Sequence, residues 1–244
     1  MTVILKFGGS VITDKANPGV IRSGVIAELA AAVAAANKPA VIVHGAGSLG
    51  HPEAKAYGIA DGVSKENARG VYVTHTAVSR LNAEVVAALR EAGVEAVSFH
   101  PFSSALAENG RLVFCGEEQI SCLLAAGIIP VLHGDVVLDR TRGGCIVSGD
   151  QIVPYLAKEL RAEAVGIVTA TGGVLADGTI IPEITRETQI AFHSAETADV
   201  TGGMQGKVEE LLALAESGIS SHIFRPEMLA AFLAGNPCGG TLVK

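Results

Sequence analysis

The sequence predicts an α/β protein in which a mainly parallel central sheet lies between helix layers, a three-layer αβα sandwich. Two observations indicate this fold. Short apolar runs alternate with segments of helical periodicity along the whole chain. The strand-like runs are continuously apolar, as in parallel strands that are covered on both faces. A chain of 244 residues can bury a large core, either as one α/β domain or as two lobes that share a sheet.

The first half of the chain begins this alternation. Each strand signal is a short run rich in β-branched residues, and each helix signal repeats apolar residues every three or four positions. In the segment 66–92 this repeat runs from Val71 to Leu89, and Gly93 ends the helix. We expect strands at 3–7, 40–44 and 94–99, helices at 22–36, 66–92 and 117–126, and a short hairpin around 109–114.

The second half continues in the same way. The stretch 136–148 is typical of a β-hairpin with a turn at Gly143 and Gly144. Ser148 is placed to cap the next helix, with Asp150 in its first turn. A soft boundary between two runs of units lies near Leu160. We expect strands in 128–135, 164–173, 220–224 and 240–244, and helices at 148–160, 204–217 and 225–235.

Composition excludes several classes of protein. A net charge of −7, 4% aromatic residues and no run of Lys or Arg argue against nucleic acid as a partner. No uncharged apolar run reaches the roughly 18 residues of a membrane span, and no signal-peptide pattern opens the chain. The cysteines have no C-x-x-C spacing, so we expect free thiols in the cytoplasm. They are Cys115, Cys122, Cys145 and Cys238.

Five glycine-containing loops follow predicted strands or open predicted helices. Ligands of parallel α/β proteins bind at the carboxyl ends of the strands, where such loops gather. Any one of the five could be an ordinary turn, but several carry Lys, Ser or Thr, which bind anions. The loops are Lys6–Ser10, Gly45–His51, His133–Asp135, Ser148–Asp150 and Thr201–Lys207.

A dinucleotide site is one interpretation of the second loop. Its "GAGSLG" matches G-x-G-x-x-G after a strand. The acidic residue expected about 20 residues further on is missing, because Asp61 and Glu66 fall in a loop or helix. The chain also lacks the P-loop pattern G-x-x-x-x-G-K-[ST]. We therefore favour two phosphate-binding loops that face one another.

Phosphoryl transfer depends on neutralising charge around the moving group. Lys6 and Lys207 adjoin glycine-rich turns whose backbone N–H groups can approach phosphate oxygens closely. Lys15 follows the first of these turns, and Asp150 at a helix N-terminus could hold two lysines in place. The alternative for each lysine is an ordinary solvated surface charge.

The chain resembles the amino acid kinase superfamily, and within it the isopentenyl phosphate kinases. The superfamily motifs are "LKFGGSVIT", "SGDQIVPYLA" and "DVTGGMQGKV". The motif "HGAGSLGHPEAKAYG", with "THTAVSRLN" and "PVLHGDVVLD", is the more specific one. The resemblance implies an ATP-dependent kinase that uses Mg²⁺, an isoprenoid phosphate as acceptor, and a homodimer. It also implies an acceptor-binding lobe at about 1–160 and a nucleotide-binding lobe at about 161–244.

The resemblance further implies roles for individual residues. Lys15 and Lys207 would stabilise the moving phosphoryl group, and Asp150 would organise the lysines. His51 would bind the acceptor's phosphate. No residue is assigned as a metal ligand. The implied nucleotide contacts are Lys6, Gly8, Gly9, Ser10, Gly47, Asp150, Gly202, Gly203 and Lys207, and the implied acceptor contacts are Ala46, Gly50, His51 and Gly134.

His51 then has a physical rationale. An acceptor that is itself a phosphate monoester needs an extra donor, and an imidazole with a pKa near 6.5 can donate or become cationic. A phosphate monoester is mostly dianionic at neutral pH and already nucleophilic, which explains why no general base is evident. The alternative is a helix-capping or packed histidine. His44, His100 and His133, at strand ends, are expected to be structural.

Two positions depart from the family pattern. Leu49 stands where members usually have Phe, and "TATGGVLADG" places Ala170 and Gly172 where the superfamily commonly has aspartates. The second change concerns nucleotide preference rather than chemistry. For the acceptor's tail we expect a short pocket lined from the long helix by Val71, Tyr72, His75 and Val78, with Ile146 and Val131 opposite.

Other functions remain open from the sequence. A kinase for another small phosphate monoester or a phosphonate would use the same histidine loop. A non-catalytic nucleotide-binding storage or regulatory protein on this fold is a further alternative. Binding alone would not need four residues of the lysine–aspartate set, so the set favours a kinase. These residues are Lys6, Lys15, Asp150 and Lys207.

Overall fold

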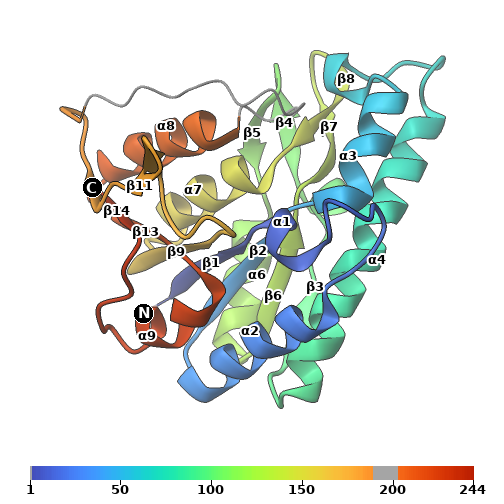
Figure 1. Ribbon diagram of the computed structural model, residues 1–244. Helices are drawn as coiled ribbons and strands as arrows, with labels where there is room; N and C mark the ends of the chain where they lie inside the picture. Colours follow the sequence, from blue (N-terminus) through green and yellow to red (C-terminus); the bar gives the residue numbers. More distant parts are fainter. Residues whose placement is uncertain (1, 189–202) are drawn as a thin grey trace.

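The computed structural model describes residues 2–188 and 203–244, which form an α/β sandwich (Figure 1). Within these residues the central sheet has eight strands, in the order β12-β14-β13-β9-β1-β2-β6-β3. Neighbouring strands are parallel except β13 and β14. The strands are β1 (Val3–Phe7), β2 (Ala40–His44), β3 (Ala96–Ser98), β6 (Ile129–His133), β9 (Ala164–Val168), β12 (Glu183–Ile184), β13 (Ser221–Phe224) and β14 (Thr241–Val243). The predicted fold class is confirmed.

β1 lies near the centre of this sheet, between β2 and β9. Every residue of β1, β2 and β6 is buried, as their continuous apolar runs predict. The register sets Lys6 beside Val43 on one side and Ile167 on the other. A lysine is therefore held inside the sheet, one residue from the edge where β1 ends.

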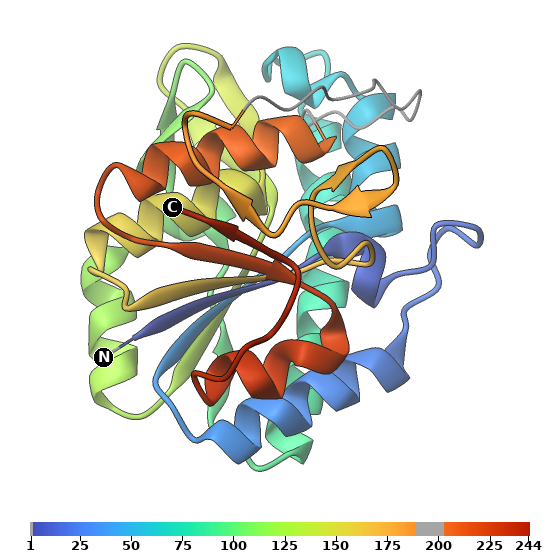
Figure 2. The same cartoon turned by 60° about the vertical axis from the view of Figure 1, so that its left-hand side comes forward.

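Helices cover both faces of the sheet (Figure 2). The helices α2, α4 and α9 pack on one face through apolar residues that include Leu29, Val85 and Leu229. The opposite face packs against α6, α7 and α8 through residues such as Ile120 and Leu156. The helices are α2 (Ser23–Ala36), α4 (Arg69–Glu91), α6 (Glu117–Ala125), α7 (Gly149–Glu159), α8 (Gly203–Ala215) and α9 (Leu229–Leu233).

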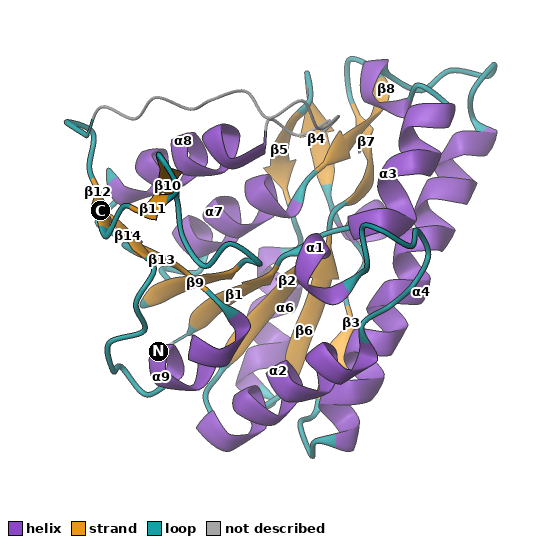
Figure 3. Ribbon diagram, in the orientation of Figure 1, coloured by secondary structure: helices purple, strands orange, loops and turns teal. Residues whose placement is uncertain are grey.

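A second, four-stranded sheet lies beyond the carboxyl end of β6 (Figure 3). Its order is β5-β4-β7-β8, and β6 leads into β7 through Gly134 alone. Its strands are β4 (Leu106–Glu108), β5 (Arg111–Phe114), β7 (Asp135–Asp139) and β8 (Gly143–Val147). The remaining elements are the helices α1 (Gly9–Ile12), α3 (Gly47–Ala56) and α5 (Pro101–Ser104), the 3₁₀ turns η1 (Ile59–Asp61) and η2 (Pro226–Met228), and the hairpin β10 (Leu175–Ala176) with β11 (Thr179–Ile180).

The structure corrects three local predictions. The β7–β8 hairpin turns at 140–142 rather than at the glycine pair, because the Asp139 carboxylate accepts hydrogen bonds from the backbone of Thr141 and Arg142. Ser148 does stand at the N-cap of α7, but its hydroxyl makes no capping bond. The stretch after Gly45, expected as a loop, forms α3.

Candidate active site

The predicted loops meet at one edge of the central sheet. β1, β2 and β6 are parallel neighbours, so the residues after Phe7, His44 and His133 emerge side by side. Backbone hydrogen bonds tie these exits together: the Gly45 N–H donates to Phe7 O at 3.0 Å, and the Gly134 N–H donates to His44 O at 3.0 Å. The expectation that the loops share one edge is confirmed for these three.

Two lysines and one aspartate form the charged centre of this edge. The Nζ atoms of Lys6 and Lys207 each lie 2.9 Å from Oδ1 of Asp150. The three residues come from β1, α8 and the first turn of α7, and their side chains are largely buried. Residues 201 positions apart in the chain thus share one carboxylate oxygen. The sequence interpretation of Asp150 as the residue between two lysines matches this geometry.

Burial and charge act against each other in this triad. Burial lowers the pKa of Lys6 to about 8, although Asp150 opposes the shift. Burial alone would raise the pKa of Asp150, but the two lysines outweigh it and hold that pKa at about 2. The carboxylate therefore stays ionised at neutral pH. Two cations facing one anion leave the centre with net positive charge, which suits a polyanionic ligand.

The loops after β1 and β2 touch through glycines. A Cβ on Gly9 would lie 2.4 Å from the Gly47 nitrogen, and one on Gly45 would lie 2.7 Å from the Gly9 nitrogen. Gly47 has φ +58 as well, a conformation that other residues rarely adopt. Only glycines allow this contact. It brings the N–H groups of two loops together, and Gly8 anchors the first loop by donating from its N–H to Val168 O at 3.0 Å.

Thr13 fastens the two loops further. Its hydroxyl donates to Gly9 O at 2.8 Å and accepts from the Ser48 N–H at 3.1 Å. Ser10 is half-buried in α1. Sequence reasoning did not single out Thr13, whose role depends on a contact 35 residues away in the chain.

His51 lies on α3, the helix that the second loop leads into. The side chain is half-buried, and within the described residues its ring makes no hydrogen bond. α3 is held against α4 at Gly50, where a Cβ would lie 2.4 Å from Cγ1 of Val78 and 2.9 Å from the Ala46 Cβ. Gly50 is therefore a close-packing position next to His51. Gly50 itself is buried and has no side chain, so the imidazole of His51 is the first side chain after this contact.

The other predicted site residues have different settings. Ala46 is half-buried, and its N–H makes no backbone hydrogen bond within the described residues. Gly134 is buried, and its N–H is already bonded to His44 O. Lys15 is exposed in the loop between Thr13 and Ile21. Gly203 begins α8 in open space, whereas Gly202 lies outside the described residues.

The loop after β9 contains Ala170 and Gly172, the two positions noted in the sequence as a departure from the pattern. Gly172 has φ +75, and a Cβ there would lie 2.3 Å from Cγ of Arg225. The Thr169 N–H donates to Phe224 O at 2.9 Å, which places the exit of β13 beside that of β9. The side chain of Arg225 thus packs against Gly172 and leaves no room for a side chain at that position.

Several histidines cluster beneath the second and third loops, and sequence reasoning missed their connections. His44 and His133 are fully buried with ring centroids 5.4 Å apart. Their hydrogen-bond partners include Asn82 and His100. The signal was available: three neighbouring strands are each followed by, or end in, a histidine at the same sheet edge.

The predicted tail pocket is only partly supported. Val78 and Val131 are buried, and His75 lies on the same flank of α4 as Val71. Tyr72 is 71% exposed, so the prediction that it lines a short apolar pocket is wrong. Tyr72 follows Val71 directly in α4 and therefore points away from the flank that Val71 and His75 share. Phe102, which sequence reasoning did not name, packs on His75 with ring centroids 4.8 Å apart.

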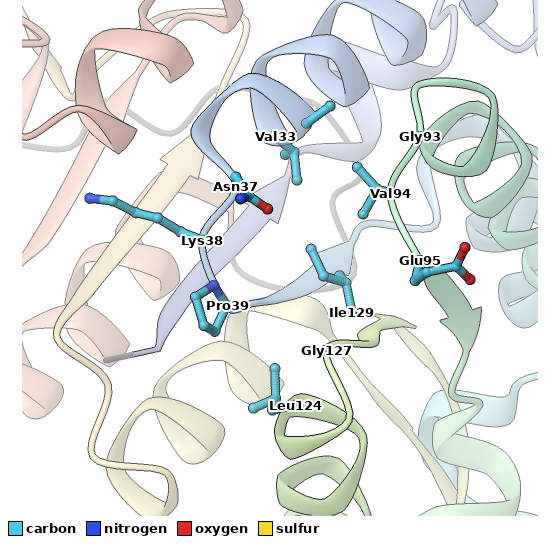
Figure 4. A pocket seen from close by; sticks show the side chains of 11 residues that line it. Val33, Asn37, Lys38, Pro39, Gly93, Val94, Glu95, Leu124, Gly127 and Ile129 are labelled. Carbon is cyan, nitrogen blue, oxygen red and sulfur yellow. The ribbon is translucent and has the colours of Figure 1, made fainter.

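Two hollows flank the sheet. One of about 430 Å³ lies beside Asp150 and is lined by β5, β8, α7 and α8, including Arg111, Ile146 and Glu210. The other, of about 310 Å³, lies at the opposite edge, where β2, β3 and β6 begin (Figure 4). Its lining includes Val33, Val94 and Ile129 and none of the predicted site residues. The candidate site is therefore at the carboxyl edge.

Three further features of the part of the chain that the structure describes concern metal-ligand clusters, disulfides and membrane-spanning helices. No three His, Cys, Asp or Glu side chains come together there as a metal site. All four cysteines are free, as predicted. Of the described helices, none combines the length and apolarity needed to cross a membrane.

The carboxyl-edge loops and the shared carboxylate define a phosphate-binding α/β protein of the kinase type. The chain belongs to the amino acid kinase family, whose model matches residues 1–225. It is 43% identical to the isopentenyl phosphate kinase of Haloferax volcanii, over 99% of this chain and 98% of that protein. It is 35% identical to the isopentenyl phosphate kinase of Methanothermobacter thermautotrophicus, with the same two coverages.

Solved structures agree with these relatives. An X-ray structure of isopentenyl phosphate kinase superposes with a TM-score of 0.86 at 33% identity, over 99% of this chain and 100% of that chain. Acetylglutamate kinases are more distant: the one from Nostoc punctiforme is 27% identical over 91% of this chain and 79% of that protein. The resemblance noted in the sequence is confirmed.

Proposed function

We propose that this protein is an ATP-dependent kinase that converts isopentenyl phosphate to isopentenyl diphosphate, a step of isoprenoid biosynthesis by an alternative mevalonate route. The observation that carries the proposal is the Lys6–Asp150–Lys207 centre, which lies at the same sheet edge as the loop that leads to His51. Membership of the amino acid kinase family and 43% identity to an isopentenyl phosphate kinase support it.

The nucleotide's phosphates would lie along the loops after β1 and β2 and the start of α8. The contacts of Gly9 with Gly45 and Gly47 bring backbone N–H groups close to one another, and such groups bind phosphate oxygens. The positive ends of α1 and α8 add to this field. The proposed contacts are Lys6, Gly8, Gly9, Ser10, Gly47, Gly202, Gly203 and Lys207, with Asp150 holding the lysines.

Transfer of the terminal phosphoryl group needs positive charge around an in-line transition state. Lys6 and Lys207 point at one carboxylate and are held 2.9 Å from it, so their ammonium groups are already in place before ligands bind. Electrostatic stabilisation by preorganised groups is usually the largest single contribution to enzymatic catalysis. We assign Lys207 and the exposed Lys15 to the moving phosphoryl group, with Lys15 reaching in from its loop.

The acceptor's phosphate would lie between α3 and the β6–β7 junction. His51 offers an imidazole donor with no competing partner among the described residues, and Ala46 a backbone N–H. The Gly134 N–H already donates to His44 O, so it is not free to bind the phosphate. The absence of a side chain at Gly134 would instead let the acceptor approach the backbone closely. Gly50 lets α3 approach α4. The dianionic acceptor then attacks without a general base.

Mg²⁺ would arrive as part of the Mg–ATP substrate. We assign no protein ligand to it, because Asp150 is engaged by both lysines through Oδ1 and the described residues hold no cluster of metal-type side chains. Mg²⁺ commonly keeps its waters and binds nucleotide phosphates directly. The protein itself would neutralise the phosphate charge through its lysines.

Three further expectations belong to the same proposal. We propose a single amino acid kinase-type domain of residues 1–244, with the acceptor on the lobe at about 1–160 and the nucleotide on the lobe at about 161–244. We also propose a homodimer in the cytoplasm. Size-exclusion chromatography with light scattering tests the dimer.

A coupled assay for ADP release, run with Mg–ATP over a panel of small acceptors, tests the function. The panel contains isopentenyl phosphate, other phosphate monoesters, a phosphonate and N-acetylglutamate. We expect the highest kcat/KM with isopentenyl phosphate. A higher value with another monoester or a phosphonate would keep the chemistry and replace the substrate. Turnover with the carboxylate alone, or none at all, would refute the proposal.

A further inference from the structure

The buried histidines below the acceptor loop have hydrogen bonds that define their protonation. His44 ends β2 and is completely buried, directly before the Gly45–Ala46 peptide. Its Nδ1 lies 3.1 Å from Gly45 O, and its Nε2 lies 3.2 Å from Nδ2 of Asn82. A carbonyl oxygen can only accept, so Nδ1 must carry the proton.

Asn82 determines the protonation of the other ring nitrogen of His44, Nε2. Its Nδ2 also donates to Val131 O at 3.0 Å. Because that carbonyl only accepts, the amide nitrogen rather than the oxygen faces Val131 and His44, and its second hydrogen points to Nε2 of His44. Nε2 must therefore be an acceptor without a proton. His44 is held as the neutral tautomer with its proton on Nδ1.

His133 repeats the arrangement one strand away. Its Nδ1 lies 3.1 Å from Gly134 O and 3.7 Å from Oδ2 of Asp135, and both of these atoms only accept. Its Nε2 lies 2.9 Å from Nδ1 of His100, which must donate. His44 and His133 stack, and two stacked cations would repel, so each neutral ring favours the other.

The remaining charged groups around the pair are few. His75 from α4 is bonded to Asp135 at 2.9 Å, which raises the pKa of His75, and its ring centroid lies 6.3 Å from that of His133. Burial lowers the pKa of His44 to about 4 and that of His133 to about 3. Within this cluster the bond to Asp135 favours the cationic form of His75, whereas burial and the hydrogen bonds described above favour the neutral forms of His44 and His133.

A fixed proton on His44 has a consequence for the loop above it. The Gly45 carbonyl and the Ala46 N–H belong to one trans peptide, so they point in opposite directions. Holding Gly45 O toward the buried ring turns the Ala46 N–H away from the core, to the side where α3 begins. That N–H has no backbone partner among the described residues.

We propose that His44 is a positioning residue of the acceptor-phosphate site. Its Nδ1–H holds the Gly45 carbonyl and thereby aims the Ala46 N–H at the acceptor's phosphate, while Asn82 keeps the ring in the required tautomer. The inference rests on the proposed function for the identity of the ligand. The tautomer itself does not depend on any ligand.

The first measurement is long-range proton–nitrogen NMR of the histidine side chains in the wild-type protein without ligand. We expect His44 to show a proton on Nδ1 only, and to stay neutral from about pH 8 to about pH 5, where an ordinary histidine would have titrated. His44→Asn identifies its signal. A proton on Nε2, or titration near pH 6.5, would overturn the proposal. This result stands whether or not isopentenyl phosphate is the substrate.

The second measurement compares two substitutions of the same residue. In His44→Asn the side-chain N–H₂ can replace Nδ1–H toward Gly45 O, whereas His44→Leu keeps the bulk and removes the donor. We expect His44→Leu to raise the KM for isopentenyl phosphate about tenfold, the value of one hydrogen bond to a charged group, with the KM for ATP unchanged. We expect His44→Asn to restore most of the loss.

A matched control separates positioning from stability. Val85→Ala removes buried volume from α4, one turn beyond Asn82, and leaves every histidine in place. It should lower the melting temperature with the acceptor KM unchanged. If His44→Leu behaves like Val85→Ala, or if His44→Asn is no better than His44→Leu, His44 only packs and the proposal is wrong. If the wild type lacks activity on every acceptor, the proposed function fails while the NMR result still decides the tautomer.

Discussion

Lys6 and Lys207 donate to the same atom, Oδ1 of Asp150, each at 2.9 Å. One lysine is fixed inside the central strand and the other on a helix that begins after residue 202. Two like charges this close would repel, so the carboxylate is what makes the pair possible. The two lysines and Asp150 therefore form the charged centre of the candidate site, and the first predictions concern these three residues.

Removing the charge of Asp150 should disorganise both lysines. In Asp150→Asn the amide cannot neutralise two ammonium groups, so Lys6 would shift further toward its neutral form. We expect kcat to fall about a hundredfold or more, since charge aimed at the transition state is typically worth about 3 kcal/mol or more. Steady-state kinetics over a range of ATP and acceptor concentrations measures it.

Asp139→Asn is the matched control for that change. Asp139 is also a buried aspartate, but its carboxylate accepts hydrogen bonds from the Gly110, Thr141 and Arg142 N–H groups in a hairpin turn. We expect Asp139→Asn to lower stability with little effect on kcat. Equal kinetic losses in the two variants would mean that Asp150 acts only through the fold.

Loss of the Lys6 charge should limit activity at alkaline pH. Its pKa is lowered to about 8, mainly by burial, so the free protein carries the Lys6 charge below that pH and loses it as pH rises. We expect kcat/KM for ATP to fall as pH rises through about 8. Lys6→Arg, which cannot deprotonate in this range, should lack that limb if it is active. An identical alkaline limb in both proteins would assign the titration to another group.

The lowered pKa of Lys6 also makes the free energy of unfolding depend on pH. The unfolded chain keeps Lys6 protonated up to its ordinary value of 10.5, whereas the folded protein releases the proton near 8. The unfolded state therefore binds more protons in that interval, and the contribution of Lys6 to stability increases with pH between the two values. Lys6→Met should remove this contribution in urea unfolding at pH values across the interval.

Lys207 and Lys15 should act mainly on the moving phosphoryl group. We expect Lys207→Met and Lys15→Met each to lower kcat more than they weaken ATP binding, because interactions made in the transition state raise kcat. Isothermal titration with a non-hydrolysable ATP analogue supplies the binding constant. Lys38→Met, on the far side of the sheet at the start of β2, is the control. Loss of nucleotide affinity with kcat intact would make them ground-state contacts.

The acceptor's tail should extend toward Val71 and His75 on α4. Val71→Ala is expected to raise the ratio of kcat/KM for a ten-carbon over a five-carbon isoprenyl phosphate severalfold, since each buried CH₂ is worth about 0.8 kcal/mol. Tyr72→Ala provides the control because that side chain is 71% exposed. A shift in Tyr72→Ala but not in Val71→Ala would place the tail on the outer side of the helix.

The positions that sequence predicted well depend on local patterns. The strands β1, β2 and β6 are short, mostly apolar runs, with Lys6 inside β1 and a histidine at the end of β2 and β6. The repeat from Val71 to Leu89 predicts α4 nearly to its ends. The glycine loops follow from these strands, since parallel strands deliver their carboxyl ends to one edge. The triad was placed with the help of the family resemblance, which supplied the roles of Lys6, Asp150 and Lys207.

What sequence missed depends on contacts between distant segments. α3 begins at Gly47 and also contains Gly50 and Pro52, so its local helix propensity is low and favours a loop. It forms because Gly50 packs against Val78 of α4. The bonds of Asn82 to His44 and Val131 join residues 38 and 49 positions apart. No periodicity in a single segment carries that information.

The role of His51 is tested by its removal. His51→Ala should raise the acceptor KM tenfold or more, because one charge-assisted hydrogen bond contributes about 1.5–3 kcal/mol. ATP binding should survive, since the imidazole lies on α3 and not in the lysine centre. His222→Ala, a histidine on β13 away from the acceptor loops, is the control. Wild-type kinetics at low acceptor concentration in His51→Ala would remove the histidine from the site.

The central claim is that the acceptor of the phosphoryl group is itself a phosphate monoester. Phosphorus NMR of the wild-type protein with Mg–ATP and isopentenyl phosphate tests it directly, because it observes the bond that forms. We predict that the monoester signal disappears, that the two coupled signals of a diphosphate ester replace it, and that ADP appears in equal amount. An unchanged monoester signal, with ATP intact or hydrolysed to free phosphate, would contradict it.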